Sequence, residues 1–597
     1  MRTSEFLNDQ FQSYPALRVM DVFAGCGGLS LGFKMAGCNV THCIEVDSTA
    51  SQTFKKNMSE TVVHTDDVKK VLEKLRLKLQ LYKDMKMLQE KYKNYVPDDG
   101  PHDSKNDFIV NIVKNGSTYE IHHKNSFTLI NYIVSPSNIR DWSKVFFYVN
   151  NIIDLPYPGC VDILIGGPPC QSFSTANITR QTESVLSEEK NELVLYFLEF
   201  AKLLRPKYVL IENVTGMISS NNNNAVLNEI RSFLHDQDYV TQASVLMATH
   251  YGVPQSRSRL FVWAVNKLKK LPLPNYPPHT HASRKIHDGV RLNMKDYLTK
   301  VPSKLDSGPL PQVNLRDILS DLPKFDDGGK NCEQYYRGKP ATLYQKRFRS
   351  DKNLHSVLLN KVSQHDGHVP KTASIIRERM NNIPNIPGSN YLDLPLHLLE
   401  KLFTTKKYRG IALGRLYWSG VCATIMCRPG PMQNSVLHPN QYRCLSIREI
   451  ARVQGFPDWF VFCGEFKDRW HQIGNAVPVT LSRCLAEHLV RVHYSHLHKT
   501  GVSGEYKHKP ASILANLIKN FIQKDVEEAR EVDIAHDQNK YDAVTRLVDS
   551  HLRDPSLNDI EERDKRRKNI KEMMQKKSEQ ENIDEDQEEY SSDELSF

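Results

Sequence analysis

The chain has 597 residues, of which 40% are hydrophobic and 25% are charged, proportions that are ordinary for a soluble globular protein. This length predicts three or four domains at roughly 100–200 residues each. The formal net charge is +9, and because residues 578–597 contain nine acidic side chains and no basic one, the rest of the chain carries +18. A basic body suits a polyanionic partner, although basic charge alone is weak evidence for one.

The cysteines and the apolar runs exclude several classes of protein. Eleven cysteines occur without C-x-x-C pairs, which argues against a disulfide framework and a zinc site and indicates a reducing compartment. The first residues, Met-Arg-Thr-Ser-Glu-Phe, contain no apolar signal region, and no uninterrupted apolar run is long enough to span a bilayer. We therefore expect no membrane partner.

Residues 17–30 predict a strand, a glycine-rich turn and the start of a helix. Such a turn lets the backbone approach a ligand closely and points helix N–H groups at it. Twenty residues after Gly25, Glu45 lies at the end of a second predicted strand, where doubly wound nucleotide sites bind ribose hydroxyls. Together the two features predict a cofactor site. The pattern Phe-x-Gly-x-Gly-Gly differs from the dinucleotide pattern G-x-G-x-x-G, so a nicotinamide dehydrogenase is disfavoured.

The run Val-Asp-Ile-Leu-Ile-Gly-Gly-Pro-Pro-Cys-Gln at 161–171 predicts a buried parallel strand that delivers Cys170 into a rigid loop. Ligand and chemistry sites of open α/β sheets lie outside the carboxyl ends of the strands. Cys170 is therefore a candidate nucleophile. The alternative is a structural cysteine, because free cysteine is among the most buried residue types.

Two later segments favour the catalytic alternative. The run Tyr-Val-Leu-Ile-Glu-Asn-Val at 208–214 predicts a strand with Glu212 near its end, facing the same cleft as Cys170. At 255–259, alternation places Arg257 and Arg259 on one face as the chain enters another strand. Strands and helices alternate from residue 17 to 265, which predicts an α/β fold with a doubly wound, mostly parallel sheet.

Three motifs in this order, Pro-Pro-Cys-Gln at 168–171, Glu-Asn-Val at 212–214 and Gln-x-Arg-x-Arg at 255–259, resemble those of the DNA cytosine-5 methyltransferases. Within that family the chain looks most like the eukaryotic maintenance-type enzymes and the plant chromomethylases. The resemblance covers about residues 17–490, with a gap over 70–159. It implies a class I fold that binds S-adenosylmethionine (SAM), duplex DNA as partner, a nuclear location and an irregular second domain for target recognition.

The resemblance also implies a role for each residue of the cofactor site. Glu45 would bind the ribose hydroxyls, Val46 would lie on the adenine face, and Asp67 would accept from the adenine amino group. Ala24 stands where relatives often carry Ser, so one hydroxyl contact to the methionine end is absent. For Asp67 the alternative is a solvated loop after a short strand. The other cofactor contacts would be Phe23 near the adenine, Gly25, Gly27, Gly28, Leu29, Val68, and, in the segment Gln-Ile-Gly-Asn-Ala-Val-Pro near the end, Asn475 and Val477.

Cytosine C5 is a weak nucleophile, so the ring needs activation by a nucleophile that adds at C6. The family resemblance assigns that step to the Cys170 thiolate. Glu212 would carry or share a proton to bond N3, and Arg259, supported by Arg257, would hold O2. The target cytosine must be flipped out of the duplex, and the long loop at 172–189 would close over it as a mobile lid.

The rest of the chain supplies the domain plan. Residues 17–69 and 156–266 would form the cofactor and catalytic halves of one domain, completed by a return segment at 437–495. The other segments would be a charged helix with a small β-rich module inserted at 70–155, an irregular target-recognition region at 267–436, and a charged, largely disordered tail at 496–597. In the tail, the basic run at 565–568 has the composition of a nuclear import signal or of a solvated tail.

Two of these segments carry candidate partner sites. Chromomethylases have a chromodomain where this chain has its insert, so we consider binding of chromatin or a histone tail through residues 100–150. Tyr119, Tyr132 and Trp142 would then form a methyl-lysine cage by cation–π attraction, the alternative being a small aromatic core. For the recognition region, Gln255, Arg347 and Arg349 are candidate DNA contacts, and a solvated charged face is the alternative for the two arginines. We predict no metal, because the cysteines there are widely spaced.

Two functional alternatives remain open at this point. An RNA cytosine-5 methyltransferase uses the same catalytic residues, although the large region 267–436 favours DNA. A catalytically silent chromatin-binding scaffold would keep the fold, although every expected catalytic residue is present. The sequence leaves open whether CpG or CHG sites are the target, and whether hemimethylated or unmethylated DNA is preferred.

Overall fold

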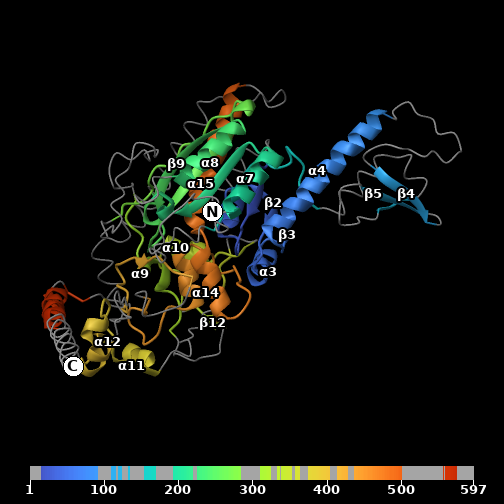
Figure 1. Cartoon of the computed structure of the whole chain (residues 1–597). Coiled ribbons are helices and arrows are strands. Elements are labelled where there is room, and N and C mark those ends of the chain that lie inside the picture. The colour runs from blue at the N-terminus through green and yellow to red at the C-terminus, as the bar shows by residue number, and fades with distance from the viewer. Residues whose placement is uncertain are drawn as a thin grey trace, which may run out of the picture.

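A computed structural model describes residues 15–91, 109–115, 118–123, 132–134, 154–169, 192–218, 225–283, 310–324, 333–336, 338–352, 357–363, 374–403, 413–427, 436–500, 555–556 and 558–573. Its centre is a seven-stranded sheet in the order β3-β2-β1-β7-β8-β11-β9 (Figure 1). The strands are β1 (Arg18–Val22), β2 (Asn39–Ile44), β3 (Val62–His64), β7 (Ile163–Gly166), β8 (Tyr208–Val214), β9 (Tyr239–Met247) and β11 (Ser258–Asn266).

Helices cover both faces of this sheet, as the doubly wound prediction requires. One buried cluster contains residues of α2 (Gly28–Met35) and α15 (Val479–Thr500), and a second contains residues of α4 (Val68–Lys91), α7 (Glu192–Leu204) and α8 (Ala225–Asp236). The central strand β7 is buried along its whole length. Such a strand needs apolar side chains on both faces, which explains its near-continuous hydrophobic sequence.

Strand β11 is antiparallel to both of its neighbours, β8 and β9. The remaining pairs in the sheet, from β3 to β8, are parallel. The prediction of a mostly parallel sheet is therefore confirmed, with one reversed strand. Because β11 runs antiparallel to β8, its start lies beside the end of β8. Arg259 pairs with Val214 and Phe261 pairs with Glu212, which brings Arg259 near Glu212.

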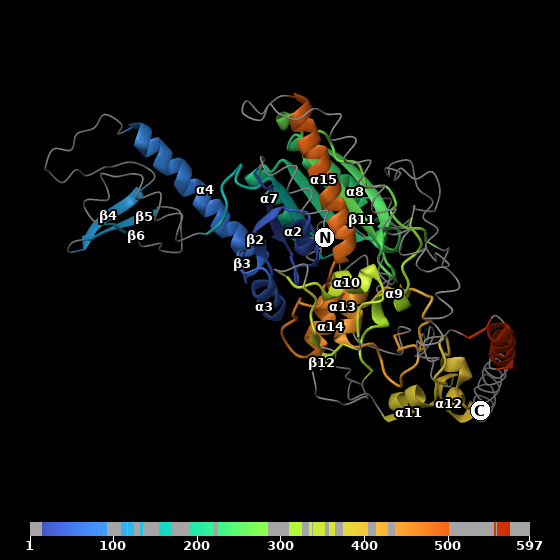
Figure 2. The same ribbon diagram turned by 180° about the vertical axis from the view of Figure 1, so that it is seen from behind.

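The insert begins with α4, which extends away from the sheet (Figures 1 and 2). Its base is fixed, because Lys78 donates a 2.6 Å hydrogen bond to the Leu155 carbonyl and Arg76 pairs with Glu199 at 3.1 Å. Beyond α4 the strands β4 (Ile109–Asn115), β5 (Thr118–His123) and β6 (Tyr132–Val134) form an antiparallel sheet. The predicted β-like insert is present. Trp142 and the side chains of Tyr119 and Tyr132 lie outside the described part, so the cage stays a prediction.

A second lobe faces the carboxyl ends of the parallel strands. The region predicted to be irregular contains short helices, α9 (Leu315–Leu319), α10 (Leu343–Arg349), α11 (Ser374–Asn382) and α12 (Leu396–Phe403), and the strands β12 (Glu333–Tyr335) and β13 (Lys361–Ser363), which pair with each other. Strands β10 (Gln255–Ser256) and β14 (Cys422–Ala423) pair across the two lobes. This pair brings the recognition region against the entry to β11.

The return segment completes the body. It contains α13 (Ile447–Val453), α14 (Phe466–Asn475) and α15. The first of these begins at Ile447, directly after the N-cap Ser446, whose side chain accepts from the Glu449 amide in a capping box. Helix α15 continues to Thr500, beyond the predicted end of the domain at 495. The remaining elements are α3 (Ser48–Asn57) and 3-10 turns at Thr215–Ile218, Ala248–Tyr251, Lys267–Lys269 and Tyr391–Asp393.

The segment 496–597 differs in part from the predicted tail. Within it, residues 558–573 form a helix, drawn in red in Figure 1, beside α12. Across the described residues, no helix is long and apolar enough to cross a membrane. The same residues contain no cluster of three or more His, Cys, Asp or Glu that could hold a metal ion.

Candidate active site

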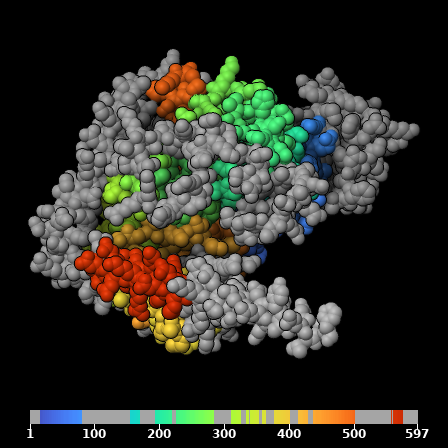
Figure 3. Space-filling model, turned by 60° about the vertical axis from the view of Figure 1, so that its left-hand side comes forward, coloured from blue at the N-terminus to red at the C-terminus, as the bar shows by residue number. Residues whose placement is uncertain are grey.

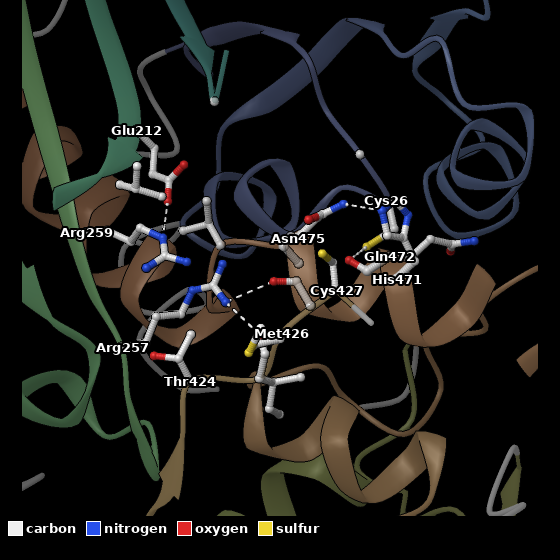
Figure 4. A pocket seen from close by; sticks show the side chains of 18 of the residues that line it. Cys26, Glu212, Arg257, Arg259, Thr424, Met426, Cys427, His471, Gln472 and Asn475 are labelled. Atoms are coloured by element: carbon white, nitrogen blue, oxygen red, sulfur yellow. Dashed lines mark hydrogen bonds and ion pairs between the residues drawn. The ribbon is translucent and has the colours of Figure 1, made fainter. Parts of the chain in front are cut away.

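One cavity of about 1620 Å³ opens between the carboxyl ends of the parallel strands and the second lobe (Figure 4). It is lined by the glycine-rich turn, the ends of β2, β7 and β8, the start of β11, and parts of 414–427 and 471–477. These segments lie far apart in sequence. The cavity is where the topology of an open α/β sheet predicts a ligand site.

The glycine-rich turn is built from left-handed backbone and close packing. Gly25 and Gly27 have φ of +55° and +95°, values that glycine adopts without strain. A Cβ on Gly28 would lie 2.6 Å from the Val477 carbonyl oxygen and 3.0 Å from the Ala476 Cβ. Gly28 is thus the position at which the return segment touches the turn, and Val477 lines the cavity beside it.

Glu45 orients this turn through its carboxylate. One carboxylate oxygen accepts from the Gly25 amide at 2.7 Å and the other from the Asp47 amide at 2.9 Å. Burial raises the pKa of Glu45, and these two backbone bonds act against that rise. The next side chain, Val46, is 66% exposed and lines the cavity. An apolar side chain uncovered inside a cavity fits the flat face of a ring.

The remaining predicted cofactor residues also meet in this half of the cavity. Phe23, Leu29, Asp67, Val68 and Asn475 line it. Asp67 is exposed and accepts from the Lys69 amide at 2.8 Å, and the Asn475 amide hydrogen bonds with His471 at 3.1 Å. By contrast, Asp66 is held by Lys74 at 2.8 Å.

Asp21 was not singled out from the sequence, although it lines the same cavity. It is 1% exposed and accepts a 2.6 Å hydrogen bond from the Ser30 hydroxyl. Burial raises the pKa of Asp21 to about 7. The signal that would have found it is its place in the first strand, one residue before that strand ends at the turn.

Glu212 and Arg259 form an ion pair in the other half of the cavity, with 3.1 Å between the Arg259 Nε and the Glu212 Oε1. Their side chains are 15% and 13% exposed for Arg259 and Glu212, respectively. Burial lowers the pKa of Arg259, and Glu212 acts against that effect. Gly167 leaves room for this carboxylate, because a Cβ there would lie 3.0 Å from Oε2. Figure 4 shows the pair beside Arg257.

Arg257 joins the two lobes from beneath the pair. It is 3% exposed, and its Nη1 donates to the Gly474 carbonyl at 2.9 Å and to the Ile425 carbonyl at 3.3 Å. Burial lowers its pKa well below the usual value. Arg257 therefore positions backbone on both sides of the cavity, and its support of Arg259 in catalysis stays a prediction.

Cys170, the predicted nucleophile, and the predicted lid at 172–189 lie outside the described residues. The structure does describe Pro169, which immediately precedes Cys170 and lines the cavity. The Asn213 side chain donates to the Pro168 carbonyl at 3.0 Å and ties this loop to the end of β8. The loop therefore approaches the cavity on the Glu212 side.

Two of the predicted DNA contacts are buried instead. Gln255 is fully buried, donating to the Gln454 side chain at 2.8 Å and accepting from the Ile425 amide at 3.0 Å. Arg349 is 5% exposed, donates to the Gly338 carbonyl at 2.9 Å and lies 3.9 Å from the centre of the Tyr336 ring. The structure therefore places Gln255 in a buried contact between the two lobes and Arg349 inside the second lobe, rather than on an exposed surface that could contact DNA.

The third predicted contact, Arg347, is exposed on α10 but does not line the cavity. Its role in DNA binding stays a prediction. The sequence analysis also missed the far wall of the cavity, formed by Gly388, Asn390, residues 414–417 and Arg567. This wall consists mainly of irregular backbone, whose sequence has no hydrophobic periodicity from which it could be predicted.

The sheet order, the reversed strand next to last, the glycine-rich turn and the acidic end of β2 together define a class I SAM-dependent methyltransferase fold. The family model described as C-5 cytosine-specific DNA methylase matches residues 17–89 and 127–491. The chain belongs to this family.

Individual relatives agree with that assignment. The chain is 30% identical over 532 residues to DNA (cytosine-5)-methyltransferase 1 of Mus musculus, covering 79% of this chain and 28% of the relative. It is 31% identical over 495 residues to DNA (cytosine-5)-methyltransferase 1B of Oryza sativa subsp. japonica, with the same two shares. The chain thus spans about three tenths of the length of these relatives. A solved structure described as a prophage DNA modification methyltransferase (E. coli) aligns with a TM-score of 0.46 and 22% identity, over 80% of this chain and 99% of that one.

Proposed function

We propose that the protein is a DNA (cytosine-5)-methyltransferase that transfers a methyl group from SAM to C5 of a flipped-out cytosine in duplex DNA. One observation carries the proposal. The Glu212–Arg259 ion pair, the loop leading to Cys170 and the glycine-rich turn all line one cavity. Membership of the family supplies the substrate class.

The glycine-rich half fits the proposed cofactor. The left-handed glycines expose backbone at the turn, Val46 offers an uncovered apolar face, and Glu45 lies in position to bind the ribose hydroxyls. Asp67 would accept from the adenine amino group, and Asn475 and Val477 would close the pocket from the return segment. When bound there, SAM supplies the electrophilic methyl group.

The other half fits the proposed chemistry on the base. The Cys170 thiolate would form a bond to C6, which moves electron density toward N3 and O2. Glu212 would hold a proton at N3, and Arg259 would stabilise the negative charge that develops at O2. After methylation, loss of the C5 proton to a base or water restores the C5–C6 double bond and expels Cys170.

The ion pair prepares Arg259 for that role. A guanidinium held by a carboxylate in a desolvated site keeps its orientation, and low exposure makes its charge more effective on a neighbouring oxygen. Arg257 fixes the backbone around it through Gly474 and Ile425. The base would then meet donors that need no rearrangement.

The domain plan is part of the same proposal. The second lobe would bind duplex DNA over the cavity, and its phosphate contacts predict affinity that falls steeply with salt. Action on chromosomal DNA would require a nuclear location, and the eukaryotic origin of the relatives supports this part of the proposal. The β4–β6 sheet would serve as the separate module that binds chromatin or a histone tail.

Methyl transfer from radiolabelled SAM tests the proposal directly. We expect label in duplex DNA and none in transfer RNA, and loss of labelling in Cys170→Ser. Duplex DNA containing 5-fluorocytosine should form a covalent adduct that Cys170→Ala abolishes. Labelled RNA with unlabelled DNA would contradict the proposal in favour of an RNA methyltransferase, and no transfer to either would favour a silent scaffold.

A further inference from the structure

The helix at 558–573 is attached to the second lobe rather than extended from it. Ile570 packs against the main buried cluster, and the Arg563 guanidinium donates to the Ser389 hydroxyl at 3.2 Å. Figure 3 shows this helix in red, lying over the yellow segment that contains α11 and α12. Residues nearly 200 positions apart therefore form one surface.

Arg567 makes the strongest of these contacts. Its Nη2 pairs with the Asp393 Oδ2 at 2.5 Å and donates to the Gly388 carbonyl at 2.9 Å, while its Nε donates to the Asp393 Oδ1 at 3.2 Å. The two side chains are 11% and 8% exposed. A bidentate pair with so little exposure is directional and weakly screened.

One partner of Arg567, Gly388, belongs to the far wall of the cavity, and the other, Asp393, accepts a 2.9 Å hydrogen bond from the Asn390 amide in that wall. Gly388, Asn390 and Tyr417 all line it, as does Arg567 itself. Gly388 has φ of +78°, and a Cβ on it would lie 1.9 Å from the Tyr417 ring. Arg567 therefore binds a loop that has no space to shift toward Tyr417. This contact fixes the position of the far wall.

The basic neighbours of Arg567 have a different situation. Lys565, Arg566 and Lys568 are exposed, and within the described residues none of them takes part in a hydrogen bond or ion pair. A helix advances about 100° per residue, so these three point away from the side on which Arg567 is anchored. Arg567 is thus separable from the rest of the basic run, which offers a matched control.

We infer that Arg567 is a positioning residue for duplex DNA, holding through Asp393 the wall that the DNA meets as it enters the cavity. This inference rests on the proposed function and deepens it. The helix at 558–573 would then be a part of the recognition lobe. The wall is distinct from the glycine-rich turn, so loss of Arg567 should weaken the use of DNA without weakening the use of SAM.

Steady-state kinetics on the full chain test the inference. For Arg567→Ala we expect KM for duplex DNA to rise about tenfold, with KM for SAM and kcat within about twofold of wild type. Arg567→Lys keeps the charge without the bidentate geometry, so its KM for duplex DNA should rise less than that of Arg567→Ala. Each single change, Arg567→Asp or Asp393→Arg, should raise KM for duplex DNA. The double variant with both changes should bring KM most of the way back to the wild-type value. Arg566→Ala, on the exposed neighbour, should behave as wild type.

Each other result has a definite meaning. Equal KM for DNA in Arg567→Ala and wild type overturns the inference while leaving the proposed function intact. Equal losses in Arg567→Ala and Arg566→Ala overturn it in favour of direct phosphate binding by the basic run. If Arg567→Ala unfolds at a much lower temperature than wild type, Arg567→Lys and the exchanged pair decide, and failure of both overturns it. Absence of methyl transfer by the wild type removes the proposed function and the inference together.

Discussion

The sheet and the second lobe bury their backbone by different means. In the sheet, strand pairing satisfies the peptide groups, and aliphatic side chains such as those of β7 fill both faces. The strands in the described part of the second lobe are short, so many carbonyl groups there need other donors. Buried guanidinium groups supply them, and a guanidinium carries five N–H donors in one plane.

Arg448, which reaches the second lobe from α13 of the return segment, and Arg415, which lies in the lobe itself, illustrate this arrangement. Arg448 is fully buried and donates to the carbonyls of Ser363, Pro457 and Phe460 at 3.1, 3.0 and 2.8 Å. Arg415 is 3% exposed and donates to the carbonyls of Ile383, Pro384 and His438 at 3.2, 2.8 and 3.0 Å. Irregular backbone can thus be buried with its carbonyl groups hydrogen bonded, provided that the arginines are in place.

Replacing Arg452 should have the largest effect and tests whether buried arginines stabilise the irregular backbone. Its guanidinium pairs with Asp321 at 2.5 Å and with Asp458 at 2.6 Å, and it is fully buried. Arg452→Met leaves two buried carboxylates short of their main partner, so we expect a loss of about 3–5 kcal/mol in the free energy of unfolding. Urea denaturation measures it.

The matched control for Arg452 is Arg347→Met, at an exposed position on α10 of the second lobe, where a change within about 0.5 kcal/mol is expected. Similar losses at the two positions would show that the lobe does not depend on buried arginines.

Asp21, in the central sheet, predicts how the stability of the protein depends on pH. Its folded pKa of about 7 lies above the unfolded value of 3.8, so the folded state binds more protons between these values. Stability should therefore fall as pH rises from about 4 to about 7 and then level off, by at most about 4 kcal/mol. Thermal unfolding across this range gives the slope, and Asp21→Asn should flatten it. An unchanged slope in that variant would assign the titration to other groups.

Glu212→Gln, in the cavity between the two regions, tests whether the catalytic half of the cavity acts separately from the half proposed to bind SAM. The amide keeps the shape but loses the charge that orients Arg259 and the proton proposed for N3. We expect methyl transfer to slow by about 100-fold, with SAM affinity unchanged. Single-turnover labelling and calorimetry measure the two quantities. A comparable loss of SAM affinity would contradict the separation of the two halves.

Gly28→Ala gives the smallest expected effect, at the contact between the turn and the return segment. The new methyl group would overlap the Val477 carbonyl and Ala476, and overpacking of this kind costs about 1–3 kcal/mol. We expect a lower unfolding midpoint together with weaker SAM binding. Normal SAM affinity in this variant would show that the turn tolerates displacement from Val477.

The sheet could be predicted from sequence because its signals are local. Apolar runs that end at glycine or a carboxylate gave β1, β7 and β8, and the Ser446 cap gave the start of α13. The reversed direction of β11 carries no such signal, because a strand sequence does not encode its orientation. Local signals likewise predicted the glycine-rich turn and Glu45, whereas the resemblance to the methyltransferase family supplied Asp67, Val68, Asn475 and Val477.

The second lobe resisted prediction because its order comes from contacts between distant residues. A basic and aromatic cluster at 344–349 suggested DNA contacts, yet Arg349 proved to be one of the buried arginines. The same composition suits a phosphate and a row of buried carbonyls, so the sequence cannot separate them. Arg567 was hidden likewise, since its partner Asp393 lies 174 positions away.

The contact between the glycine-rich turn and the last long helix also governs how the protein is made. Ser482 on α15 donates a 2.6 Å hydrogen bond to the Leu29 carbonyl, and Tyr494 reaches the Pro15 carbonyl at 2.9 Å. At a synthesis rate of about 5–20 residues per second, the glycine-rich turn therefore leaves the ribosome tens of seconds before α15 is synthesised. During translation the nascent chain holds an unfinished nucleotide pocket, and chaperones have that interval in which to shield it.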